Sequence, residues 1–153
     1  MKEMHTLLLV TGTAPEKFPE AKLFGADGLL IDLEASVPLQ QKEVARNNAI
    51  SYINREKNLT IGVRINSIQE KDGFLDIVAI IKTEIKPKFI VLSKVELPEE
   101  VIILDHLFAT QPIPYVILIE SLRAMDQAEA IINASQNIIG LSFGIKDISA
   151  DLG

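Results

Sequence analysis

The sequence contains no cysteine among its 153 residues. A disulfide framework, a thiolate nucleophile and a cysteine-ligated zinc site are therefore excluded. Long apolar runs are also missing, because no segment approaches the roughly 20 apolar residues that a membrane-spanning helix needs. The apolar stretch at residues 7–10 is too short for a secretory signal. These absences predict a cytoplasmic protein that has no membrane partner.

The sequence has no excess of basic charge either. Lysine and arginine together number 15, aspartate and glutamate number 21, and the net charge is −6. Binding to nucleic acid requires a concentrated basic surface, so nucleic acid is not expected as a partner. The apolar fraction of 48% and the charged fraction of 24% suit a soluble protein with a buried core. The length predicts a single domain over residues 1–153.

Six short runs rich in valine, isoleucine and leucine recur along the chain. Each run is almost continuously apolar, which is typical of parallel strands that are buried on both faces. The predicted strands are residues 6–10, 28–33, 60–65, 89–92, 114–119 and 138–143.

Longer segments with helical spacing lie between these runs, and residues 42–52 and 72–85 are two of them. In the second, the spacing predicts an apolar face made by Leu75, Val78, Ala79 and Ile85. Asp72 is predicted to cap the start of this helix.

The order of elements is therefore a strand followed by a helix, repeated about six times at intervals of roughly 22 to 32 residues, as in βαβ units. Right-handed crossovers make the strands parallel and place helices outside them. An open doubly wound sheet and a closed barrel both fit this order. A (β/α) barrel has eight strands and about 250 residues, so six units would leave it incomplete.

Polar or small residues follow each predicted strand, where parallel βα folds gather their chemistry. Carboxylates there offer oxygen ligands for Mg²⁺, and an arginine can bind a substrate carboxylate through two parallel hydrogen bonds. A self-compensating network of ion pairs is the alternative for each residue taken singly; as a convergent set they favour a site. The residues are Gly12, Asp32, Glu34, Arg64, Asn66, Lys94, Glu96, Glu120, Ser121, Lys146 and Asp147.

Six blocks of sequence resemble the citrate lyase β-subunit (HpcH/HpaI aldolase) family, in the family's order and over essentially the whole chain. They are HTLLLVTG at 5–12, GADGLLIDLEASV at 25–37, VRIN at 63–66, IVLSKVE at 90–96, PYVILIESLR at 114–123 and IGLSFGIKDISADLG at 139–153. The resemblance implies an α/β fold of the TIM-barrel type, with about six of its eight βα units in this chain.

The resemblance also implies an activity and a site. Such enzymes are Mg²⁺-dependent carbon–carbon lyases that cleave a citryl- or malyl-type 3-hydroxyacyl thioester of CoA or acyl carrier protein. The metal ligands fall on Glu120 and Asp147, and the substrate-binding arginine falls on Arg64. Glu34 is a catalytic candidate that would orient metal-bound water.

Three strand-end residues complete the predicted substrate site. Gly12 is expected to allow close approach of the backbone to the ligand, and Asn66 and Lys94 are expected to contact the substrate. A Schiff base on Lys94 is the less favoured alternative, because neighbouring acids favour a charged lysine in an ion pair.

Several positions depart from the family's pattern. The usual Leu-Glu-Asp after the second strand is Leu33-Glu34-Ala35 here, and the usual proline before Lys94 is Ser93. The last two strands of the barrel are not represented, and open sheet edges favour pairing with another chain. We therefore expect a homo-oligomer or complementary subunits rather than a monomer. The alternatives to a thioester lyase are a class II aldolase acting on free 2-oxo acids and a non-catalytic paralogue with a binding or assembly role.

Overall fold

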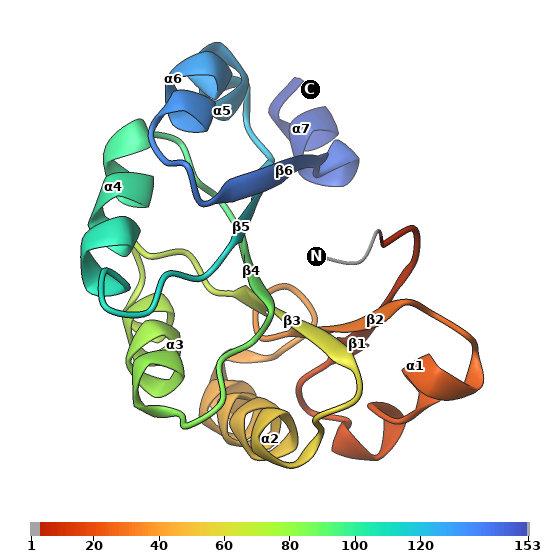
Figure 1. Cartoon of the computed structure of the whole chain (residues 1–153). Helices are drawn as coiled ribbons and strands as arrows, with labels where there is room; N and C mark the ends of the chain where they lie inside the picture. Colours follow the sequence, from red (N-terminus) through yellow and green to blue (C-terminus); the bar gives the residue numbers. More distant parts are fainter. Residues whose placement is uncertain (1–3, 153) are drawn as a thin grey trace. The chain divides into compact units, whose positions relative to one another are not determined.

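The computed structural model describes residues 4–152, apart from the side chains of residues 146, 151 and 152. The chain divides into two compact lobes, an N-terminal lobe that ends at Phe89 and a C-terminal lobe that begins at Ile90. Each lobe is built from strands that alternate with helices, as the hydrophobic pattern predicts (Figure 1).

The N-terminal lobe contains three parallel strands in chain order. They are β1 (Leu7–Thr11), β2 (Gly28–Asp32) and β3 (Thr60–Ile65), and the register pairs Leu7 with Gly28 and Gly28 with Thr60. The connections hold the short helices η1 (Pro15–Lys17), α1 (Glu20–Leu23) and η2 (Leu39–Gln41), and the longer helices α2 (Lys42–Arg55) and α3 (Lys71–Lys82).

The C-terminal lobe repeats the pattern. Its strands are β4 (Phe89–Leu92), which begins at the boundary between the lobes, β5 (Tyr115–Ile119) and β6 (Ile138–Phe143). β5 pairs in parallel with β4 and with β6. The helices are α4 (Pro98–Leu107), α5 (Leu122–Asp126), α6 (Ala128–Asn133) and α7 (Ile145–Leu152).

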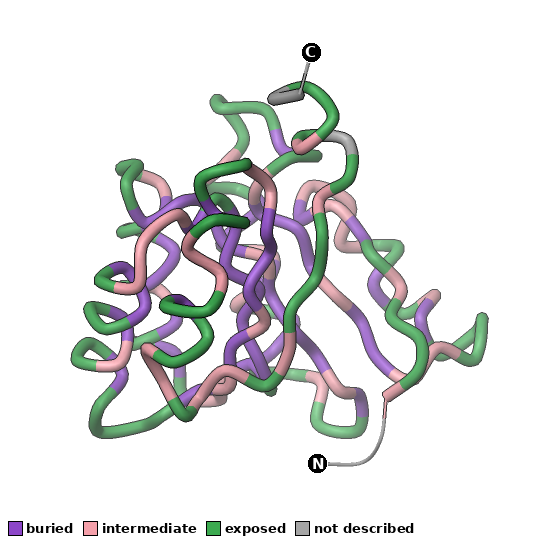
Figure 2. Tube along the Cα trace, turned by 90° about the horizontal axis from the view of Figure 1, so that it is seen from above, coloured by how far each residue is buried: buried purple, intermediate pink, exposed green. Residues whose placement is uncertain are grey.

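All six predicted strands are present, and each boundary agrees to within one residue. The reason is that parallel strands covered on both faces are apolar at most positions, which makes them conspicuous in the sequence. β4 shows this clearly, since all four of its residues are buried. Most residues of β2, β3, β4 and β5 are buried, whereas β1 has one buried residue and β6 has none. Figure 2 shows many exposed residues on the outer helical turns.

The predicted orientation of α3 is wrong. Leu75 and Val78 are 40% and 43% exposed, and the buried face carries Gly73, Asp76 and Ile77 together with Ile80. The apolar residues of α3 lie on most sides of the helix, so hydropathy alone does not identify its buried face. The buried face is instead marked by a glycine and a paired charge.

The predicted cap is also wrong, and the start of α3 depends on a glycine instead. The helix begins at Lys71 after an extended Glu70, so Asp72 lies inside the first turn. A Cβ atom added to Gly73 would lie 2.0 Å from the carbonyl oxygen of Ser67. Only glycine allows the first turn of α3 to approach the backbone after β3 so closely.

No helix among residues 4–152 combines the length and the apolar character that crossing a membrane would require.

Candidate functional site

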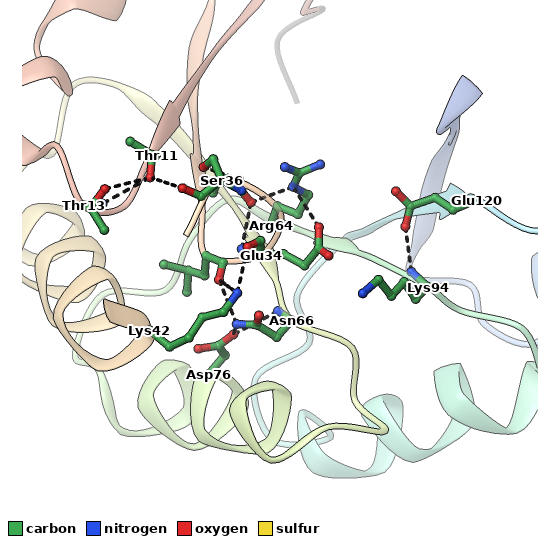
Figure 3. A network of polar contacts seen from close by, with 12 residues as sticks. Thr11, Thr13, Glu34, Ser36, Lys42, Arg64, Asn66, Asp76, Lys94 and Glu120 are labelled. Atoms are coloured by element: carbon green, nitrogen blue, oxygen red, sulfur yellow. Dashed lines mark hydrogen bonds and ion pairs between the residues drawn. The ribbon is translucent and has the colours of Figure 1, made fainter. Parts of the chain in front are cut away.

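An ion pair links the ends of β2 and β3 in the N-terminal lobe (Figure 3). The parallel register places Asp32 beside Arg64, and the Arg64 Nε atom donates to Asp32 Oδ1 at 2.7 Å. The carboxylate of Glu34 is close by, with its Oε2 atom 3.9 Å from Arg64 Nε. Sequence analysis selected all three residues, and the structure brings them together.

Asp32 is fully buried, and its carboxylate accepts hydrogen bonds from four donors. Besides Arg64 these are the N–H of Glu34 at 2.9 Å, the N–H of Ser36 at 2.8 Å and the Ser36 hydroxyl. Burial acts to raise the pKa of Asp32, but these donors, led by Arg64, outweigh it and lower the pKa to about 2. Asp32 is therefore ionised at neutral pH and held in one orientation.

The Asp32 contact determines how the Arg64 guanidinium is turned. Because Nε donates to Asp32, the two terminal nitrogens point away from that carboxylate (Figure 3). A planar guanidinium fixed in this way presents parallel N–H groups that match a carboxylate. The arrangement is suited to binding an organic acid.

The loop that follows β2 is fastened through its carbonyl groups. The Lys42 ammonium donates to Leu33 O at 2.9 Å and to Glu34 O at 2.7 Å, and the Asn66 side-chain amide also donates to Leu33 O at 2.9 Å. Asn66 is buried, so its side-chain nitrogen supports this loop. The substrate contact expected of Asn66 stays a prediction.

A second buried ion pair lies behind Asn66, and sequence reasoning missed it. Asp76 in α3 accepts hydrogen bonds from Asn66 Nδ2 at 2.7 Å, from Asn66 N at 3.0 Å and from Arg46 Nε at 2.7 Å. Burial raises the pKa of Asp76 against these opposing contacts. Arg46 also binds the Asp72 carboxylate at 2.8 Å. The sequence did contain a signal. Arg46 in α2 and Asp76 in α3 each lie three or four residues from small or apolar residues that are buried on the same helix.

Gly12 is buried at the end of β1 and is fixed by packing. A Cβ atom there would lie 2.8 Å from the Cβ of Ala45 in α2, and the Gly12 carbonyl accepts a hydrogen bond from the Asn48 amide at 3.0 Å. This contact with α2 explains why the position is glycine. A contact between Gly12 and substrate stays a prediction.

In the C-terminal lobe, the backbone after β4 holds the carboxylate of Glu120. Lys94 has a positive φ of 56°, and its N–H donates to Glu120 Oε2 at 3.0 Å (Figure 3). A lysine in this left-handed region is strained by about 1–2 kcal/mol. This strain lies in the turn whose N–H holds the predicted metal ligand Glu120, which points to a functional constraint on the turn.

Gly144, between β6 and α7, leaves space for the same carboxylate. A Cβ atom at Gly144 would lie 2.6 Å from Glu120 Cγ and 3.0 Å from its Oε1. Asp147 follows in the first turn of α7, is exposed, and donates its N–H to Gly144 O at 3.1 Å. Gly144 thus contacts both residues, because its open side lies against the Glu120 side chain and its carbonyl accepts from the Asp147 N–H.

The two carboxylates match the small protein contribution that Mg²⁺ prefers, which is one or two carboxylates with water and substrate oxygens. Within residues 4–152, no cluster of three or more acidic or histidine side chains could hold a metal by itself. The donor set therefore fits a magnesium ion that is completed by other oxygen ligands.

Comparison with known proteins shows which family the chain resembles. The family model for HpcH/HpaI aldolase/citrate lyase matches residues 5–153. The citrate lyase subunit beta of Haemophilus influenzae is 24% identical and covers 99% of this chain and 55% of the relative. The L-malyl-CoA/beta-methylmalyl-CoA lyase of Cereibacter sphaeroides is 29% identical and covers 93% of this chain and 48% of the relative. The chain spans about half the length of these relatives.

Solved structures give the same result. RipC from Yersinia pestis superposes with a TM-score of 0.83 at 33% identity, over 99% of this chain and 62% of that one. CitE from Mycobacterium tuberculosis, in complex with magnesium, acetoacetate and coenzyme A, has a TM-score of 0.81 at 28% identity, over 100% and 53%.

The predicted fold class is therefore confirmed, as an α/β fold of the TIM-barrel type in which this chain supplies six βα units. The chain belongs to the HpcH/HpaI aldolase/citrate lyase family.

Proposed function

We propose that the chain carries the site of a Mg²⁺-dependent carbon–carbon lyase that cleaves a citryl- or malyl-type thioester. The bond between the hydroxyl-bearing carbon and the thioester α-carbon breaks as the hydroxyl loses its proton. The products are a 2-oxo acid and an acetyl-thioester enolate, which takes up a proton. The observation that carries this proposal is the Arg64 guanidinium, fixed by buried Asp32 at the ends of the strands.

Arg64 would bind the substrate carboxylate through its terminal nitrogens. Because Asp32 already orients the guanidinium in the free protein, little side-chain freedom remains to be lost on binding. The partly exposed Glu34 carboxylate, beside Arg64, would hold water molecules in place around the reacting hydroxyl.

Glu120 and Asp147 would hold the magnesium ion. The Lys94 N–H and the open space over Gly144 keep the Glu120 carboxylate in one position, and Asp147 lies one helical turn beyond that glycine. Bound magnesium would supply Lewis acidity, which lowers the pKa of the substrate hydroxyl and stabilises charge on oxygen.

One relative and one solved structure support a thioester as the substrate class. One is named as a malyl-CoA lyase, and one solved structure holds magnesium, acetoacetate and coenzyme A. Both CoA and acyl carrier protein fit as the carrier of the thioester. The substrate acid is a small hydroxy dicarboxylic or tricarboxylic acid, since a carboxylate is what Arg64 is arranged to bind.

The test is calorimetric titration of oxaloacetate into the purified chain with and without Mg²⁺. We expect binding that requires Mg²⁺ and falls at least tenfold in both Arg64→Lys and Glu120→Gln. Arg123→Lys is the matched control, because Arg123 is exposed and pairs with Glu96. Wild-type affinity in the Arg64 and Glu120 variants would contradict the proposed site.

A further inference from the structure

The first residue of α2 is linked to Arg64 through one peptide group. Lys42 Nζ donates to the carbonyl of Leu33 at 2.9 Å, and the N–H of the same peptide bond, on Glu34, donates to Asp32 Oδ1 at 2.9 Å. Asp32 Oδ1 is also the atom that accepts the hydrogen bond from Arg64 Nε.

The planarity of this peptide couples its two ends. In a trans peptide the C=O and N–H groups point in opposite directions and rotate together. Donors that hold the Leu33 oxygen therefore direct the Glu34 N–H into Asp32. Lys42 makes this hold stronger than a neutral donor would, because it is charged and also binds Glu34 O at 2.7 Å.

Asn66, which follows β3, also binds the carbonyl of Leu33. Its amide donates to Leu33 O at 2.9 Å, and its position is set by buried Asp76, which Arg46 of α2 binds. Both contacts on Leu33 O thus depend on charged residues of α2. Lys42 makes one contact directly, and Arg46 supports the other through Asp76 and Asn66.

We infer that Lys42 is a positioning residue, which acts through the Leu33–Glu34 peptide and Asp32 to orient the Arg64 guanidinium for carboxylate binding. This role rests on the proposed function. Without the ammonium group, Asn66 alone holds the Leu33 carbonyl, so the peptide rotates more easily, the hydrogen bond from the Glu34 N–H to Asp32 Oδ1 weakens, and the Arg64 guanidinium is held less firmly.

The test compares Lys42→Met with Lys42→Arg, which retains charged donors, and with Lys82→Met, which removes an exposed lysine of α3. Two quantities are measured: the affinity for oxaloacetate in the presence of Mg²⁺, and the ¹⁵N NMR signal of Arg64 Nε–Hε, assigned by its loss in Arg64→Lys. We expect Lys42→Met to lower the affinity about tenfold, as for loss of a charged hydrogen bond, and to shift and broaden the Arg64 signal. Lys42→Arg should restore both in part, and Lys82→Met should change neither.

An unchanged Arg64 signal in Lys42→Met would overturn the positioning role, whatever happens to binding. If Arg64→Lys binds oxaloacetate like the wild type, the proposed function fails, while the Arg64 signal still decides the role of Lys42. If Lys42→Met does not fold, Lys42→Ser, whose side chain is too short to reach the Leu33 carbonyl, is measured in the same way. A wild-type Arg64 signal in that variant would equally overturn the role.

Discussion

Asp32 connects the ionisation of one carboxyl group to the stability of the folded chain. Its pKa is about 2 in the folded protein and has an ordinary value of 3.8, so the folded state favours the ionised form. The resulting stabilisation is about 2 kcal/mol. It is fully present above pH 4 and is lost as the pH falls through the folded pKa.

We therefore expect the free energy of unfolding to decrease between pH 4 and pH 2 by about 2 kcal/mol more in the wild type than in Asp32→Asn. Urea denaturation at a series of pH values measures this difference. Equal pH dependence in the two proteins would show that the Asp32 carboxylate is not the group responsible.

Lys94 provides a prediction about backbone strain. Because its φ is 56°, glycine at this position should make the protein about 1 kcal/mol more stable than alanine does. The opposite order is expected at Asn47, an exposed position inside α2, where alanine is the better helix former. Denaturant unfolding of the four variants measures both differences.

The same pair of Lys94 variants separates the backbone from the side chain. The contact with Glu120 uses the Lys94 N–H, so Mg²⁺ affinity should survive both substitutions. The substrate contact predicted for the Lys94 ammonium would be lost in both. Loss of Mg²⁺ binding in the glycine variant would contradict a purely backbone role at the metal site.

At the scale of elements, the junction of β6 and α7 should control the metal site. A methyl group at Gly144 would collide with Glu120, whereas a methyl group at Gly140, within β6, would meet nothing within 4 Å. We expect Gly144→Ala to weaken Mg²⁺ binding at least tenfold, because Glu120 must move. Gly140→Ala is the matched control and should bind like the wild type, as measured by calorimetric titration.

The strands were predictable from the sequence, but the faces of the helices were not. Strands of a parallel sheet form nearly continuous apolar runs, so β3, β4 and β6 were located to the residue. In α3, the buried face includes Asp76, whose burial is stabilised only by Arg46 and Asn66, residues distant in the chain. Hydropathy assigns each residue by itself and cannot include such a partner.

Part of the polar geometry at the strand ends was predictable in the same way. Strand ends identified Asp32 and Arg64, which the structure pairs, because neighbouring parallel strands bring their carboxyl ends together. The sequence did not identify Lys42, because its contacts are with backbone carbonyls, which carry no residue type. Their orientation depends on the path of the loop after β2.

At the scale of the whole molecule, the chain corresponds to about half of its curated relatives, and β6 has an unusually exposed surface for a parallel strand. Ile139 is 45% exposed and Phe143 is 59% exposed, and both are large apolar residues. Parallel sheets are normally covered on both faces. The structure divides into two compact lobes, and the single domain expected over residues 1–153 stays a prediction.

This exposed apolar surface predicts that the isolated chain associates in solution. Light scattering after size-exclusion chromatography should give a mass above 16.9 kDa that rises with protein concentration. Phe143→Ser and Ile139→Thr should lower the average mass, because they reduce the apolar area that association would bury. A constant monomer mass for the wild type over a wide concentration range would contradict this expectation.

The contact between Gly73 and the Ser67 carbonyl has a consequence for motion. It leaves no space between the first turn of α3 and the segment after β3, so neither can slide past the other. The backbone N–H of Asn66 is bound to Asp76 in α3. It can exchange with solvent only when α3 separates from the segment after β3. The segment after β3, which carries Asn66, and the start of α3 should therefore open as one cooperative unit, at a single rate.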